Sequence, residues 1–116
     1  MNDDQKDLFK SLSKNMSMED LQSYFLKVLK VRGFSEQSLK DKVFLLAEEL
    51  GELAKAVRKD EKNMPVDISK INNCDSVEGE IADMGILLIS ICNLLNLNLF
   101  DCIINKEKIN VERKWK

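Results

Sequence analysis

The 116-residue sequence predicts an all-α protein with one small domain. In two long segments, apolar residues recur at alternating spacings of four and three, the pattern of one helix face. The chain has one proline and four glycines, so few residues interrupt a helix. Little of it alternates apolar and polar residues as strands do. We expect 1–16 to be poorly ordered or weakly helical and 17–116 to form the domain.

The first clear helix is expected from about Met18 to Arg32. Ser17 precedes it at the place of an N-cap residue, and the segment carries apolar residues at helical spacing. Gly33 follows it, where a C-cap glycine is favoured. Both ends of this helix are therefore marked in the sequence.

Two longer helices are expected from about Leu39 to Lys59 and from about Ser76 to Leu95. Each carries six apolar residues at alternating spacings of four and three, which we call its apolar seam. The seams are Leu39, Val43, Leu46, Leu50, Leu53 and Val57 in the first helix, and Val77, Ile81, Met84, Leu88, Ile91 and Leu95 in the second. Because the two seams share one rhythm, we expect these helices to pack together.

A long loop, 59–76, is expected between these helices because it contains the proline and no apolar periodicity. A last helix is expected from about Leu99 to Lys114. The two long helices are apolar over most of their circumference. We therefore expect a bundle of about four helices that completes its core by oligomerisation, as a homodimer or homotetramer.

Composition excludes several classes of function. The net charge is -2 with Lys and Arg spread along the chain, so no basic stripe for nucleic acid is present. No apolar run reaches the roughly 20 residues of a membrane span, and the N-terminus has no signal-peptide core. We expect a cytoplasmic protein whose partners include neither nucleic acid nor a membrane.

The catalytic residue types are limited as well. The three cysteines, Cys74, Cys92 and Cys102, form no C-x-x-C pair and are odd in number, so neither a disulfide framework nor a thiolate zinc site is indicated. Histidine is absent, which excludes Ser-His-Asp and Cys-His nucleophile systems. Any chemistry is expected to use carboxylates, amines and metal.

Acidic residues lie beside the apolar seam in both long helices. In helical projection, Glu49 and Glu52 share one flank of the first seam, and Glu48 lies nearly opposite that seam. Glu80 and Asp83 share the corresponding flank of the second seam. On facing apolar flanks, four carboxylates would cost roughly several kcal/mol unless a cation neutralises them or some become protonated. Oxygen ligands favour Mg²⁺ or Mn²⁺ over zinc, and Mg²⁺ suggests a phosphorylated substrate.

Two other classes of protein fit part of this pattern. Acidic spacings of this kind are ordinary on solvated helix faces. A non-catalytic dimeric helical interaction module, binding a basic partner, would explain the amphipathic helices equally well. A nucleotide or metal sensor could keep the same fold without turnover. The matching position of both acidic pairs beside their seams favours a metal site.

The two acidic motifs together resemble a known family. E-E-x-x-E is present as Glu48–Glu52 and E-x-x-D as Glu80–Asp83, with 27 residues between them. This combination resembles the MazG-like nucleoside triphosphate pyrophosphohydrolases, and the resemblance runs from about Leu21 to Trp115. It implies an all-α enzyme that uses Mg²⁺, with Mn²⁺ as a substitute, to convert an NTP or dNTP to the monophosphate and pyrophosphate.

The resemblance also implies roles for individual acidic residues. The expected metal ligands are Glu49, Glu52, Glu80 and Asp83. The catalytic motif would be formed by Glu48, Glu49 and Glu52. Three roles stay open for Glu48: to orient a water, to lie at a subunit contact, or to be simply solvated.

A C-terminal pattern of the family is matched by Lys106, Asn110 and Arg113, which are expected to contact the phosphates and sugar of the substrate. On a continuous helix these three side chains project within roughly 60° of one another. The alternative is a solvated cationic face near a helix C-terminus, where Lys and Arg are favoured anyway.

Overall fold

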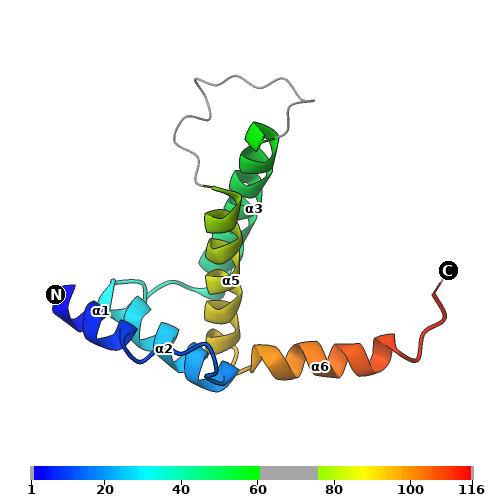
Figure 1. Ribbon diagram of the computed structural model, residues 1–116, viewed down its shortest axis with the longest axis horizontal. Helices are drawn as coiled ribbons and strands as arrows, with labels where there is room; N and C mark the ends of the chain where they lie inside the picture. The colour runs from blue at the N-terminus through cyan, green and yellow to red at the C-terminus, as the bar shows by residue number, and fades with distance from the viewer. Residues whose placement is uncertain (1, 61–75, 116) are drawn as a thin grey trace. The chain divides into compact units, whose positions relative to one another are not determined.

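The computed structural model describes residues 2–60 and 76–115 (Figure 1). Within these ranges the chain has five helices and no strand, which confirms the predicted all-α class. The helices are α1 (Asn2–Phe9), α2 (Met18–Val31), α3 (Leu39–Asp60), α5 (Val77–Leu94) and α6 (Leu99–Asn110). The predicted loop 59–76 lies mostly outside the described residues, and its first two residues still belong to α3.

The predicted bounds of α2, α3 and α5 are correct to within one residue at each end. Helix α1 lies in the segment expected to be poorly ordered or weakly helical. Helix α6 ends at Asn110, four residues before the predicted Lys114. The Trp115 indole N–H donates to the Asn110 carbonyl oxygen at 3.0 Å, so the chain folds back there and satisfies an acceptor that the helix end leaves open.

The ends of α2 are those that its sequence predicts. Ser17 is the N-cap, and its hydroxyl accepts a hydrogen bond from the Asp20 N–H at 3.0 Å. After the helix, Gly33 has φ +89°, the left-handed conformation that glycine adopts at low cost. The Phe34 N–H then donates to the Leu29 carbonyl oxygen at 2.9 Å, which closes the helix with a Schellman-type bond.

Side-chain caps also begin the two helices that carry the acidic motifs. Ser38 and Asp41 form a reciprocal capping box, in which the Asp41 N–H donates to Ser38 Oγ at 3.1 Å and the Ser38 N–H donates to Asp41 Oδ2 at 3.0 Å. At the start of α5, the Gly79 N–H donates to Ser76 Oγ at 3.0 Å. These caps fix where each helix begins, and hence which way its acidic residues point.

The chain divides into two compact units, Met1–Gln37 with Ile89–Lys116 and Ser38–Leu88. In the first, Gln22 links α2 to the corner between α5 and α6. Its Nε2 donates to Asn93 Oδ1 and to the Leu97 carbonyl oxygen, both at 2.9 Å, and its Oε1 accepts from the Leu99 N–H at 2.8 Å. Because Gln22 is only 7% exposed, these bonds satisfy a buried amide and hold the three segments together.

The second unit contains α3 and the first turns of α5, which lie side by side (Figure 1). On α3 the most covered face carries buried Lys42, half-buried Glu49 and buried Ala56 at seven-residue intervals. One carboxylate oxygen of Glu49 lies within 4.8 Å of a carboxylate oxygen of Glu80 in α5. The face of α3 turned toward α5 is therefore its acidic flank.

The apolar seams, by contrast, are largely exposed within one chain. In α3, Leu50 is 56% exposed, and in α5 Ile81 is 58% exposed. Other seam residues that are also exposed are Leu39, Val43, Val57, Leu88 and Leu95. The two long helices do lie side by side, as their shared rhythm predicts, but within the single chain their acidic flanks meet and much of each seam stays exposed. Glu49 lies about 80° around α3 from the centre of the seam. A regular apolar repeat identifies an apolar face of a helix, but it does not identify the element that covers that face.

The described ranges contain no single helix long and apolar enough to cross a membrane. Helices α5 and α6 together reach the necessary length and composition, but a sharp bend separates them.

Candidate metal site

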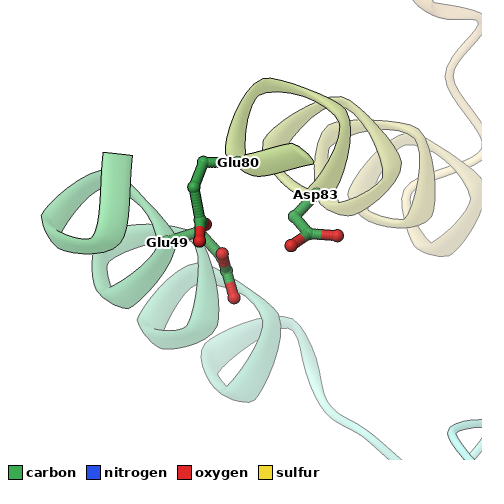
Figure 2. A group of neighbouring side chains, drawn as sticks. All are labelled: Glu49, Glu80 and Asp83. Carbon is green, nitrogen blue, oxygen red and sulfur yellow. The ribbon is translucent and has the colours of Figure 1, made fainter. Parts of the chain in front are cut away.

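Three carboxylates from two helices meet in the Ser38–Leu88 unit (Figure 2). Glu49 comes from α3, and Glu80 and Asp83 come from α5, one helical turn apart. One oxygen of each lies within 4.8 Å of the other two. We call these residues the carboxylate cluster. Three of the four predicted metal ligands are thus close together.

Glu80 is the most deeply buried member of the carboxylate cluster. It is 3% exposed, and its Oε2 atom has no hydrogen-bond partner. A buried carboxylate oxygen without a partner loses hydration that nothing replaces, which is costly, so buried polar groups are normally paired. The position of Glu80 in the first turn of α5 offsets part of this cost, because a helix N-terminus favours negative charge. The remaining cost points to a proton or cation as the missing partner.

The protonation of Glu49 reflects the same crowding. Its pKa is raised to about 7, first by the side-chain hydrogen bond with Glu80, then by burial, and then by the negative charges of Glu80, Asp83 and Glu52. A hydrogen bond between two carboxyl groups requires a proton on one of them. With a pKa of about 7, Glu49 is mostly protonated below neutral pH, and a cation can compete with that proton.

Glu52, the fourth predicted ligand, lies beside the carboxylate cluster. It is half-buried, and its charge contributes to the raised pKa of Glu49. Its carboxylate also forms an ion pair with Lys55 at 3.5 Å, between side chains that are 41% and 50% exposed. Exposed pairs of this kind are worth about 1 kcal/mol or less, so this one could open readily. Glu48 is exposed.

The carboxylate cluster fits a hard divalent cation. Its donors are all carboxylate oxygens, which Mg²⁺ and Mn²⁺ prefer, and Mg²⁺ commonly keeps water and substrate phosphates as its other ligands. Two oxygens bound to one Mg²⁺ at about 2.1 Å lie at most about 4.2 Å apart. The observed spacing, up to 4.8 Å, needs only small rotations of the side chains to meet that limit.

The predicted substrate residues are arranged differently. Lys106 is exposed on α6, and Asn110 is the last residue of that helix, where its Nδ2 donates to Glu107 Oε1 at 3.2 Å. Arg113 follows the helix, and its guanidinium lies 5.8 Å from the centre of the Trp115 ring. Since Arg113 is outside α6, the predicted shared helix face does not include it.

One buried cation, Lys42, was not singled out by the sequence patterns. It is 6% exposed and shares a face of α3 with Glu49, seven residues further on. Burial lowers the pKa of Lys42, and the neighbouring charge of Asp41 partly opposes that shift. In the sequence, only its spacing of seven residues from Glu49 marks Lys42, and a solvated lysine could have the same spacing.

Comparison of the chain with protein-family models, curated proteins and solved structures found no match.

Proposed function

We propose that this protein is a Mg²⁺-dependent nucleoside triphosphate pyrophosphohydrolase, which converts an NTP or dNTP to the monophosphate and pyrophosphate. The observation that carries the proposal is the unpartnered Oε2 of buried Glu80, within a cluster completed by Glu49 and Asp83. The order and spacing of the two acidic motifs, which resemble those of the MazG-like enzymes, give the class of reaction.

In this proposal Glu49, Glu80 and Asp83 would hold the metal, and Glu52 would join them after separating from Lys55. When bound, Mg²⁺ neutralises charge on the triphosphate and makes a bound water more acidic. As a ligand Glu49 would be ionised, so it would release its proton to solvent. We assign Glu52 to accept a hydrogen bond from the attacking water.

The water oxygen bonds to the α-phosphorus as the bond from that phosphorus to the α–β bridging oxygen breaks. Pyrophosphate leaves with that oxygen, and the proton lost by the water is carried first by a carboxylate. The protein's part is mainly positioning and charge neutralisation, as is usual for phosphoryl transfer. The mechanism needs no covalent intermediate.

The direct test is incubation of the chain with a panel of NTPs and dNTPs, with Mg²⁺ or with EDTA, followed by separate assays of pyrophosphate and orthophosphate. We expect pyrophosphate and the monophosphate in equal amounts, only with Mg²⁺ or Mn²⁺. Orthophosphate as the first product would contradict the proposal. If the folded protein binds Mg²⁺ and nucleotide without turnover, it is a sensor.

A second candidate function is favoured by a different observation. The exposed apolar seams of α3 and α5 suit a helical interaction module, and they also suit the oligomer that we propose for the enzyme. Absence of nucleotide hydrolysis together with stable assembly would favour the module.

We predict at least a homodimer in solution. Leu50→Lys should weaken it, because Leu50 is 56% exposed within one chain and its replacement should leave the chain folded. Light scattering measures both effects. A wild-type mass near 13.3 kDa at working concentration would rule out this assembly.

A further inference from the structure

Three charged residues follow one another along α3, each about one helical turn after the last. Glu49 belongs to the carboxylate cluster, Glu52 follows it at a spacing of three, and Lys55 follows Glu52 at the same spacing. Side chains at this spacing are neighbours on the surface of a helix. A cation therefore stands beside Glu52, the predicted metal ligand that the carboxylate cluster does not include.

Lys55 and Glu52 form an ion pair. The Lys55 Nζ atom lies 3.5 Å from Glu52 Oε1, and both side chains reach solvent. Helical side chains tilt toward the N-terminus of their helix, so Lys55 points back over the turn that carries Glu52. The Lys55 ammonium thus occupies the carboxylate that Glu52 would offer to a metal.

Ligation of a metal by Glu52 would weaken this ion pair in two ways. The ammonium and the metal would compete for the same carboxylate, and their positive charges would repel each other. An ion pair that reaches solvent is weak, so this competition is sufficient to separate it. Lys55 has a flexible four-carbon stem and can then turn to another anion close by, and lysine is a common ligand of phosphate.

We propose that Lys55 is a substrate contact that pairs with Glu52 in the metal-free protein and turns to the leaving pyrophosphate when Glu52 binds the metal. The inference rests on the pyrophosphohydrolase function proposed above. Negative charge develops on the β- and γ-phosphates as the bond to the α-phosphorus breaks, and a fixed positive charge there stabilises the transition state. No proton or covalent bond changes in the exchange, since one cation replaces another at Glu52.

The first measurement follows Mn²⁺ binding to the full chain without nucleotide, through the electron paramagnetic resonance signal of the free ion. Lys55→Gln keeps a polar side chain but removes the competing charge. Because an exposed ion pair is worth a small factor in an equilibrium, we expect the variant to bind Mn²⁺ about two- to fivefold more tightly than the wild type. Equal or weaker binding would overturn the exchange at Glu52.

The second measurement is the binding of inorganic pyrophosphate at saturating Mg²⁺, by calorimetry. Lys55→Gln should bind it about tenfold more weakly, and kcat/KM for the triphosphate should fall by a similar factor. Lys55→Arg keeps the charge, so it should recover part of the pyrophosphate affinity. A residue that only supports the helix would not strengthen metal binding while weakening pyrophosphate binding. Unchanged pyrophosphate affinity in Lys55→Gln would overturn the substrate contact.

The matched control is Lys59→Gln, an exposed position about one turn further along α3, which should leave both affinities and the turnover unchanged. The two proposals fail in different ways. A wild-type chain that shows both expected effects of Lys55→Gln on binding but hydrolyses no nucleotide would contradict the enzyme function and leave the exchange standing. Hydrolysis that is unchanged in Lys55→Gln would contradict the role of Lys55 alone.

Discussion

The acidic pairs were predicted from their positions beside the apolar seams, and Lys106, Asn110 and Arg113 were implied by the family resemblance, yet the structure treats the two regions differently. The cluster gathers side chains from two separate helices within 4.8 Å. The C-terminal residues belong to one segment, in which the helix ends before the third of them. Residues on two different helices come together when those helices pack against each other. Residues along one helix share a face only as far as that helix continues.

The carboxylate cluster and the C-terminal residues also differ in what their burial costs the fold. Glu80 is an acid at 3% exposure with an unpartnered oxygen, an arrangement that is unfavourable in the metal-free fold. Lys106 and Arg113 are exposed, and a solvated cation costs the fold nothing. Unfavourable burial of charge is a mark of functional sites, so the acidic region supports a function more strongly.

The largest expected effect is the loss of activity in Glu80→Gln. The amide preserves shape but removes the ligand charge, so kcat/KM should fall at least about 100-fold, equivalent to about 2.7 kcal/mol of transition-state stabilisation. Thermal stabilisation by Mg²⁺, worth about 2.7 kcal/mol at 100 times its dissociation constant, should disappear as well. The matched control is Glu78→Gln, an exposed position in the same first turn of α5, which should retain both.

Steady-state kinetics and melting curves measure these effects. If Glu80→Gln keeps its activity and its response to Mg²⁺, the buried carboxylate is structural and the contrast between the two regions has no functional meaning.

A smaller effect concerns pH in the metal-free protein. The pKa of Glu49 is about 7 in the folded state, above its ordinary value of 4.5, so folding favours the protonated form. This contribution is fully present below about pH 4.5 and is lost as the pH rises toward 7, when ionised Glu49 faces the other carboxylates. We expect the loss to reach up to about 3 kcal/mol. Denaturant unfolding in EDTA between these pH values measures it.

Other carboxylates titrate over the same range, so Glu49→Gln is the control. The difference between the wild-type and variant profiles should carry the predicted slope, and saturating Mg²⁺ should abolish it. Equal slopes in EDTA would mean that Glu49 is no more crowded than a solvated glutamate.

Features carried by local sequence were the most predictable. Ser17 and Gly33 marked the ends of α2, because capping residues act within one helical turn. The bounds of α2, α3 and α5 were each predicted to within one residue. The acidic pairs were predictable because their offsets from the seams match. The flank of α3 that is covered could not be predicted, since its burial depends on the helix that packs against it.

The smallest expected effect tests the C-terminal region. If Lys106 and Arg113 contact the triphosphate, their charge-assisted hydrogen bonds should each contribute about 1.4 kcal/mol, so Lys106→Ala and Arg113→Ala should each lower kcat/KM about tenfold. Mg²⁺-dependent stabilisation without nucleotide should be unchanged, unlike in Glu80→Gln. Lys108→Ala, on an exposed position of the same helix, is the matched control and should keep full activity.

The Arg113 variant needs one further control, because the guanidinium also lies over the Trp115 ring. Arg113→Lys keeps the charge but loses the planar fork, so it should recover part of the lost kcat/KM if phosphate is the partner. Trp115→Leu removes the ring while keeping Arg113, and it should retain most of the activity. Full activity of both alanine variants across the nucleotide panel would mean that this region is a solvated cationic surface, and the carboxylate cluster would then act with substrate contacts that lie elsewhere.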